Sequence, residues 1–468
     1  MNRHATHQGN KKLFMVFVVL LGSFIATLTE TLLNNALPAI MQEIHVTQLT
    51  VQWLSTGYLL VAGIMMPTAA YFTTRFKLKP LFLGTLTIFL LGIIVSATAA
   101  SFTQLFIGRI IQAISVGIIM PLVQNILTLA FSPENRGIAL GVGGVVITLG
   151  PALGPTISGV IVHNYSWRML FIILIPIIII VILLGSISIE NITKTRPVKL
   201  DINSVLLSTI GFGSLLYSVS TLGDSNFQLK NLLLLLFSII VIAIFSYRQL
   251  HVKNPLLQLK VFKALSFRRI VLLAALTNIA LMGPELIIPL YNQNLRQVDA
   301  ITSGLIMLPG ALLSAILSPI SGNIFDRIGF RKISLIGFGL ATLFTIPMIW
   351  FNATTSIWAI SLLYAIRISG LTLVFMQVSA SGLNALSPKY LVYGSTIIIT
   401  IQQIASSLGS ALLVMIVSLG KRIGLHSGLS LINATTVGFK WAFILTLVFT
   451  AICLVYSFLI KNKTTIEI

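Results

Sequence analysis

The chain consists of a succession of apolar segments, each about twenty residues long, separated by short polar stretches. A helix needs a segment of this length to cross the hydrocarbon core of a bilayer. The apolar runs are continuous rather than alternating, which argues against a transmembrane β-barrel. The sequence therefore predicts an all-α integral membrane protein.

Composition supports this class. Of the 468 residues, 56% are hydrophobic and 9% are charged, whereas about 25% of the residues in a soluble domain are charged. The mean hydropathy of +1.00 is too high for a soluble fold. The first apolar run is longer than the core of a signal peptide, which predicts that it is retained as a span. We predict fourteen transmembrane helices: 13–33, 51–72, 81–100, 104–129, 137–162, 168–189, 202–222, 231–250, 269–290, 302–321, 333–351, 357–380, 393–418 and 438–460.

Lysine and arginine set the orientation of these spans. With the N-terminus in the cytoplasm, 22 of the 30 basic residues fall in inner segments and 6 in outer segments. This bias follows the positive-inside rule and predicts a multi-pass protein of the plasma membrane with both termini cytoplasmic. The net charge of +20 then forms a basic edge facing anionic lipid, so nucleic acid is not an expected partner.

Cysteine and histidine usage limits the chemistry. The single cysteine, Cys453, excludes an internal disulfide, and all six histidines lie in predicted tails or loops. We therefore expect no metal site within the membrane and no cofactor.

Apart from basic residues at a span's end or within two positions of it, four charged residues lie inside predicted spans: Glu30, Arg109, Glu285 and Arg367. The two acids are 255 residues apart and the two arginines 258, and loop prolines and arginines recur at similar offsets. A near-constant offset predicts two homologous halves with substrate sites between them. We expect an N-terminal six-helix half at 1–189, two inserted helices with cytoplasmic linkers at 190–268, and a C-terminal six-helix half at 269–468.

Three segments carry a specific resemblance. They are LTETLLNNALP from Leu28, GRIIQAISVGIIMP from Gly108, and GVGGVVITLGPALGPTISG from Gly141. Together they resemble the first, fourth and fifth helices of the major facilitator superfamily, and within it the fourteen-span drug:proton antiporters of the lincosamide and multidrug exporter type found in bacteria. The resemblance covers essentially the whole chain and implies the major facilitator fold. One departure is that Thr29 stands at the usual Asp position, with the acid at the next residue.

The fifth-helix segment resembles the motif that distinguishes exporters from importers in this superfamily. Its GxxxG step favours close helix packing, and its prolines interrupt the backbone hydrogen-bond ladder. We expect this helix to bend and to pack at the interface between the halves, although small residues also serve plain packing. The motif residues are Gly150, Pro151, Gly154, Pro155 and Gly159.

The segment GNIFDRIGFRK, from Gly322, closely resembles the superfamily's cytoplasmic gate loop. Its gate residues are Gly322, Asp326, Arg327, Gly329 and Arg331. The counterpart in the first half, AYFTTRFKLKP, is degraded, because Thr74 stands at the Asp position. YSWRMLFIILIP, from Tyr165, also resembles a family landmark, with Leu174 replacing the usual Asn.

Acids within a membrane point to proton coupling. Burial in a low-dielectric cavity favours the neutral form of a carboxyl group, while a nearby arginine favours the charged form. We expect Glu30 to be the main proton site and Glu285 the second, each tuned by Arg109 or Arg367. Alternatively, Glu285 lies at the mouth of the pathway, and Arg109 snorkels as a surface anchor. We expect the substrate cavity to be lined by Asn34, Gln112, Asn278, Gln377 and Gln402.

The resemblance implies a proton-coupled antiporter that exports drugs or other amphipathic, often cationic, small molecules. The alternative within transport is an exporter of one specific metabolite, such as an amino acid or a lipid-like compound. An intramembrane enzyme would need a nucleophile or a metal cluster at depth, and a channel would not drive uphill efflux. No GxxxxGK[ST] loop is present, which argues against ATP as the energy source. The expected partners are the small-molecule substrate, protons and membrane lipids, with the chain acting as a monomer.

Overall fold

The computed structural model describes residues 2–33, 36–46, 48–132, 135–191, 195, 201–222, 229–252 and 255–460. Within these ranges every regular element is helical. Eleven segments are long and apolar enough to cross a membrane, and Arg136–Pro151 and Ile202–Leu215 are shorter apolar helical segments. The predicted all-α membrane fold is confirmed, while the count of fourteen spans stays a prediction.

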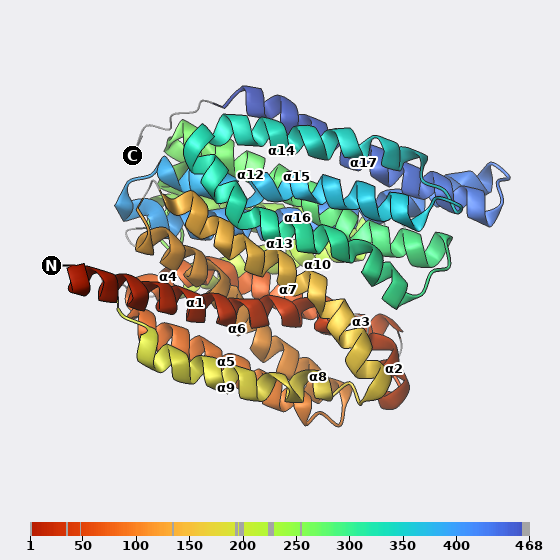
Figure 1. The fold of residues 1–468 in the computed structure, drawn as a ribbon. Helices are drawn as coiled ribbons and strands as arrows, with labels where there is room; N and C mark the ends of the chain where they lie inside the picture. Colours follow the sequence, from red (N-terminus) through yellow and green to blue (C-terminus); the bar gives the residue numbers. More distant parts are fainter. Residues whose placement is uncertain are drawn as a thin grey trace.

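The helices follow one another with short connections (Figure 1). The N-terminal helices are α1 (Asn2–Leu32), α2 (Leu37–Ile44), α3 (Gln48–Met65), α4 (Ala69–Arg75), α5 (Leu78–Ala97), α6 (Phe102–Ala130), α7 (Arg136–Asn164), α8 (Met169–Ile172) and α9 (Leu174–Ser188). Next come α10 (Ile202–Leu222) and α11 (Leu229–His251). The C-terminal helices are α12 (Leu265–Leu290), α13 (Ala300–Ile328), α14 (Phe330–Thr345), α15 (Ile357–Asn384), α16 (Leu391–His426) and α17 (Leu431–Phe458).

Proline and glycine shape two of these elements. The predicted span 51–72 is divided between α3 and α4 by a 3₁₀ turn, Met66–Thr68, centred on Pro67. Proline has no backbone N–H and so interrupts the α-helical ladder. At the end of α13, Gly329 adopts φ 82° and allows α14 to begin at the next residue. Such a backbone favours glycine because no Cβ is present to clash.

The N-terminal helices lie on one side of the molecule and the C-terminal helices on the other, and the start of α1 lies at the same end as the end of α17 (Figure 1). We call this end the terminal end and the opposite one the far end. Helix α7 packs against α1, and it also packs against α13 and α15 from the other side of the molecule. Helix α6 contacts α16 in the same way. These contacts join the two sides.

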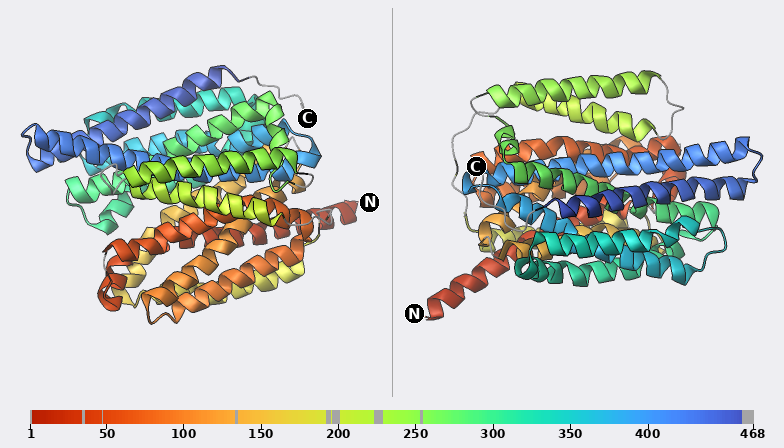
Figure 2. Two further views of the ribbon diagram at one scale, coloured as in Figure 1. Left: turned by 180° about the vertical axis from the view of Figure 1, so that it is seen from behind. Right: turned by 90° about the horizontal axis from the view of Figure 1, so that it is seen from above.

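Helices α10 and α11 lie side by side on the outside of the bundle (Figure 2). Helix α10 packs against both α3 and α16, and so bridges the two sides. Asp201 and Arg248 form an ion pair at 2.9 Å that joins the terminal-end parts of this helix pair. Large apolar side chains are exposed along α11, namely Leu232, Leu233, Leu236, Phe237, Ile239, Ile240 and Ile244.

Candidate functional site

The two intramembrane acids lie on matching helices from the two sides of the molecule. Glu30 is in the last turn of α1, and Glu285 is in the second half of α12. Both side chains are half-buried, and the ion pairs among the described residues, Glu43–Arg168 and Asp201–Arg248, include neither of them. Glu285 lies close enough to Arg367 and to Glu30 to interact with both charges. Both acids are therefore carboxyl groups without an ion-pair partner in the part of the chain that the structure describes.

Arg109, on α6, is completely buried beside the end of α1. Its Nη1 donates to the Thr29 carbonyl and to Gln112 Oε1, both at 3.0 Å, and its Nε donates to the Leu54 carbonyl at 3.3 Å. Its guanidinium carbon lies 3.8 Å from the centre of the Tyr58 ring, in a geometry typical of a cation–π contact. Its Nη2 has no hydrogen-bond partner in the part of the chain that the structure describes.

Gln112 links Arg109 to the neighbouring helix α5. Its Nε2 donates to the Gly92 carbonyl at 3.1 Å and to Ser96 Oγ at 2.9 Å, and its side chain is fully buried. We expected Gln112 to line the substrate cavity. In the structure both ends of its amide are used to hold Arg109 against α5, and its place in the substrate cavity stays a prediction.

Arg367 occupies the corresponding place on the other side. It is fully buried on α15, its Nε donates to Thr345 Oγ1 at 3.0 Å, and its Nη2 donates to the Ala280 carbonyl. Its Nη1 is unpartnered among the described residues. Tyr364, one turn earlier on the same helix, is also buried. Each arginine thus holds a carbonyl of the helix that carries an acid and keeps one free donor nitrogen.

The remaining predicted cavity residues fall in different places. Asn278 is buried on α12, where Nδ2 donates to its own helix at Ala274 and Oδ1 accepts from Ser406 Oγ of α16 at 3.2 Å. Gln402 is half-buried on α16. Asn34 lies outside the described residues.

Gln377 is fully buried on α15, and its Nε2 donates to Ser321 Oγ at 2.9 Å and to the Gly137 carbonyl at 3.5 Å. These partners belong to α13 and α7, at the terminal end. Gln377 thus joins three helices across the contact between the two sides, and its role in a substrate cavity stays a prediction.

This contact, formed by the start of α7 and the end of α13, is closely packed. A Cβ on Gly322 would lie 2.4 Å from the Gly137 carbonyl oxygen, which leaves no room for any other residue. Asp326 accepts a hydrogen bond from the Ile138 amide at 3.3 Å, at the N-terminus of α7. Ser318 Oγ donates to the Gly141 carbonyl. We call this contact the terminal-end seam.

The other predicted gate residues surround the seam. Arg327 and Arg331 are exposed at the terminal end, and Gly329 forms the turn between α13 and α14. In the degraded counterpart on α4, Thr74 Oγ1 donates to the Ala70 carbonyl of its own helix at 2.7 Å. At the seam, the carboxylate of Asp326 thus accepts from the N-terminus of α7. Thr74, at the corresponding position of the first half, bonds only within its own helix among the described residues.

The glycine pair of α7 faces α1. A Cβ on Gly150 or Gly154 would lie 2.2 Å from Thr27 Oγ1 or Thr31 Oγ1 respectively. The helix as a whole packs between the two sides of the molecule as we expected, through its contacts with α13 and α15, while the glycine pair itself packs against α1. The contacts across that interface come instead from the first turns of α7, while Gly159 lies beyond the pair on the same helix.

Two threonines of α1 donate to backbone carbonyls of α7. Pro155 has no N–H, so the carbonyl of Pro151, four residues earlier, lacks its helical donor. Thr31 Oγ1 donates to that carbonyl at 2.9 Å. A second threonine, Thr27, donates to the Val146 carbonyl at 3.3 Å. The helix that carries Glu30 is therefore bonded to the middle of α7.

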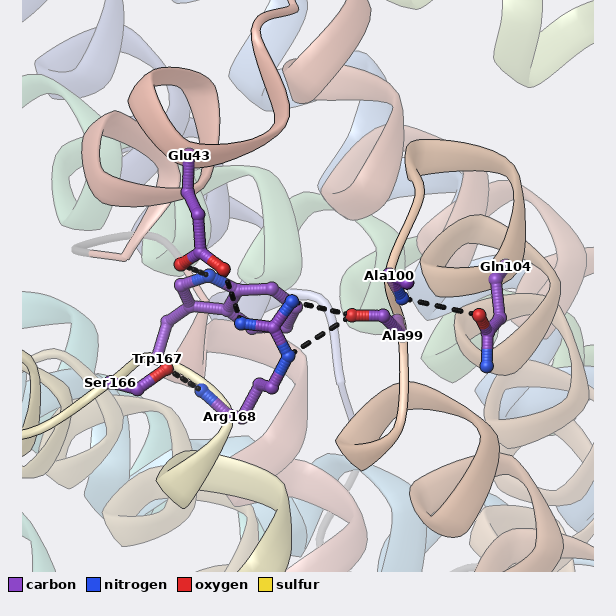
Figure 3. Close-up of polar contacts among 7 residues, drawn as sticks. All are labelled: Glu43, Ala99, Ala100, Gln104, Ser166, Trp167 and Arg168. Carbon is purple, nitrogen blue, oxygen red and sulfur yellow. Dashed lines mark hydrogen bonds and ion pairs between the residues drawn. The ribbon is translucent and has the colours of Figure 1, made fainter.

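At the far end, Glu43 of α2 is the centre of a clamp that sequence reasoning missed (Figure 3). It accepts from Trp167 Nε1 at 2.7 Å and forms an ion pair with Arg168, whose Nε and Nη2 donate to the Ala99 carbonyl at 3.0 and 2.7 Å. The hydrogen bond from Arg168 lowers the pKa of Glu43 and outweighs the opposing effect of burial. The clamp joins α2, the α5–α6 turn and the α7–α8 turn. The sequence SWR in the segment from Tyr165 marked Trp167 and Arg168 as a family landmark, but it gave no indication that Glu43 is their partner.

Comparisons with known proteins agree with this fold. The model of the Major Facilitator Superfamily matches residues 19–410. The chain is 39% identical over 450 residues to the uncharacterized MFS-type transporter YcnB of Bacillus subtilis, covering 96% of this chain and 95% of that protein. It is 33% identical over 449 residues to the lincomycin resistance protein LmrB of Listeria monocytogenes, covering 95% of each. The crystal structure of the human organic anion transporter MFSD10 superposes with a TM-score of 0.66 at 15% identity, covering 94% of this chain and 99% of that one. At that identity the likeness concerns the fold alone.

Proposed function

Since the chain belongs to the Major Facilitator Superfamily, we propose that it is a fourteen-span antiporter of a bacterial plasma membrane. It exports drugs or other amphipathic small molecules in exchange for protons. The observation that carries this proposal is the placement of Glu30 and Glu285, half-buried and unpaired, on helices from the two sides of the molecule.

The energetic reason is the cost of an unpaired charge in a membrane. A charged side chain at the centre of a bilayer costs about 2.5–3.5 kcal/mol on insertion scales. Protonation removes that charge, and so does pairing with a cationic substrate. Protonation and binding of a cationic substrate therefore exclude each other at one carboxylate. Such competition couples substrate release to proton binding, and a membrane potential supplies about 2.3 kcal/mol per 100 mV for each charge moved.

The buried arginines give each acid a second partner. Arg109 and Arg367 each keep one guanidinium nitrogen without a hydrogen bond among the described residues. Buried donors are normally satisfied, so an unsatisfied one calls for an explanation. We assign these nitrogens to the deprotonated acids in another conformation, when α1 and α12 shift along α6 and α15. The acid then has a charged partner only during part of the cycle.

Alternating access would follow from a rocking of the two halves, 1–189 and 269–468, around this site. The terminal end is closed by the seam between α7 and α13. With the termini in the cytoplasm, this is the arrangement that keeps the inner side shut while protons reach the acids from outside. The inserted segment 190–268 would stay against α3 and α16 during the movement.

Two observations favour drugs over a single metabolite. Relatives that match 95% of the chain are named lincomycin resistance proteins, and a more distant relative of Mycobacterium tuberculosis is named a multidrug resistance protein B homolog. An unpaired carboxylate also recognises any cation rather than one shape. The names of the relatives support drugs as the substrate class, and the carboxylates support cationic members of that class.

The test uses purified protein in proteoliposomes with an imposed proton gradient and ethidium as the cationic probe. We expect Glu30→Gln to reduce gradient-driven transport at least tenfold and Glu285→Gln to reduce it less, because a neutral amide cannot cycle a proton. Glu190→Gln, at an exposed acid outside the spans, is the matched control and should transport normally. Undiminished transport by Glu30→Gln would show that Glu30 is not the proton carrier.

A further inference from the structure

A groove lies on the outside of the molecule where α12, α16 and α17 meet near the terminal end. Its volume is about 550 Å³, and it is lined by residues of these helices and of the short helix before α12. The lining residues are Phe262, Leu265, Arg268, Arg269, Val271, Leu272, Ala275, Ile401 and Tyr456. We propose that this groove binds one anionic phospholipid, with the phosphate at Arg268 and Arg269 and an acyl chain along the apolar wall.

The first argument is the order of residues along the groove. Leu265, Arg268 and Leu272 recur at helical spacing on one face of α12, and the two leucines are 42% and 50% exposed. From Leu265 to Ala275 the helix rises about 15 Å. Arg268 and Arg269 lie within the first five residues of the helix, and the apolar lining residues Val271, Leu272 and Ala275 lie deeper along it. A phospholipid has the same order of charge and hydrocarbon.

The second argument is the absence of a competing acid. The short helix Leu259–Lys263, α16 and α17 contain no acidic residue, and the one acid of α12, Glu285, lies 16 residues beyond Arg269. Among the described residues neither arginine takes part in an ion pair. Two guanidinium groups beside an apolar groove attract a phosphate, because arginine presents a fork of donors to its oxygens.

The third argument separates this groove from the proposed transport site. A cationic substrate is repelled by Arg268 and Arg269, whereas an anionic lipid is attracted. Tyr456, at the rim on α17, adds an amphipathic ring of the kind found at the headgroup level of membranes. Basic pockets between transmembrane helices at the membrane surface are suited to anionic headgroups. The proposal therefore does not depend on the proposed antiport activity.

The experiment is native mass spectrometry of the purified full chain in detergent, with phosphatidylglycerol or phosphatidylcholine added. We expect one retained phosphatidylglycerol per chain and about a tenfold loss of that retention in the double variant Arg268→Ala, Arg269→Ala. The matched control is Lys260→Ala, Lys263→Ala, which removes the same charge from exposed residues just outside the groove. If both double variants lose lipid equally, the binding is diffuse electrostatics and the proposal is wrong.

A further variant tests the apolar part of the groove. Ala275→Trp fills the deep end without changing the charge, and it should also abolish retention of phosphatidylglycerol. If it retains the lipid while inorganic phosphate displaces it, the site is a phosphate site and not a lipid groove. Deletion of residues 461–468 should leave retention unchanged. Lipid binding that occurs only after that deletion would identify the chain's own tail as the occupant and overturn the proposal.

Discussion

Replacing Asp326 by asparagine should weaken the terminal-end seam. Asp326 is the sole acidic residue of α13, and α7 contains none. Its carboxylate accepts from the Ile138 amide at the first turn of α7. There it also meets the partial positive charge of the helix N-terminus. Asparagine preserves the size and one acceptor but loses the charge.

The size of the effect follows from these contacts. A hydrogen bond to a charged group contributes about 1.5–3 kcal/mol, and a neutral one about 0.5–1.5 kcal/mol. The helix terminus adds about 0.3–1 kcal/mol for a charge near the surface. Because Asp326 is exposed to solvent, the lower ends of these ranges apply. The expected loss is about 1 kcal/mol, which shifts the equilibrium toward the opened seam about fivefold.

The chain suits a labelling assay, since its single cysteine is buried. In a Cys453→Ser background, a reporter Ala139→Cys sits in the first turns of α7 at a buried position. Asp326→Asn should raise the rate of maleimide labelling there about fivefold. The control is Asp299→Asn, which makes the same change at the other end of α13, where Asp299 accepts from the Thr302 amide of its own helix. Equal rates for the two variants would refute the role of the charge at the seam.

Two further predictions concern stability, measured by thermal unfolding of the purified protein. Because the Arg168 hydrogen bond lowers the pKa of Glu43 from its usual 4.5, the stability contributed by the clamp is present above pH 4.5 and lost as the pH falls through the lowered pKa. Glu43→Gln should therefore unfold at a lower temperature than the wild type at pH 7, and its stability should no longer fall with the titration of this carboxyl group. An unchanged unfolding temperature at pH 7 would contradict the role of the clamp. Gly337→Ala should destabilise by about 1–3 kcal/mol, since its Cβ would lie 2.5 Å from the Gly370 carbonyl oxygen. Gly339→Ala has nothing within 4 Å and should not destabilise, so equal losses at both positions would contradict the packing argument.

The helical membrane fold was predictable because its signal is local. A run of twenty apolar residues predicts a transmembrane span whatever the sequence of the neighbouring segments. A charge inside such a run is equally visible, which is why Glu30, Arg109, Glu285 and Arg367 were found from the sequence. The Arg109–Gln112 contact was also predictable from the spacing of three residues, and the structure contains it as a 3.0 Å hydrogen bond.

The contacts between helices were not predictable in the same way. Gln112 and Gln377 were expected to line a cavity because they are polar at depth, but a buried amide satisfies itself equally well between helices. Tyr58 was overlooked because its partner Arg109 is on another helix. Tyr364 could have been identified from the sequence, because it lies three residues before Arg367 and therefore on the same face of the helix. Tertiary packing determines which face of a helix contacts which neighbouring helix. The periodicity of a single helix does not contain this information.

The glycine pair of α7 illustrates the same limit. The GxxxG step correctly indicated a close approach, but small residues favour any near neighbour, and here that neighbour is α1. The direction of the contact became visible only with the threonines of α1 in place. The motif therefore predicted a close approach, and α7 does pack between the two sides, but the motif did not predict that the glycine pair itself faces α1.

The bonding of α1 to α7 has a mechanical consequence. The same α7 helix that is stapled to α1 by Thr27 and Thr31 runs on to the terminal-end seam at Gly137 and Ile138. The acid Glu30 is thus next to one end of this α1–α7 contact, and the seam lies at the start of the same α7 helix. The fourteen residues from Gly137 to Pro151 rise about 21 Å, so we expect a displacement of α1 at the acid to reach the seam through one helix and without passing through a loop.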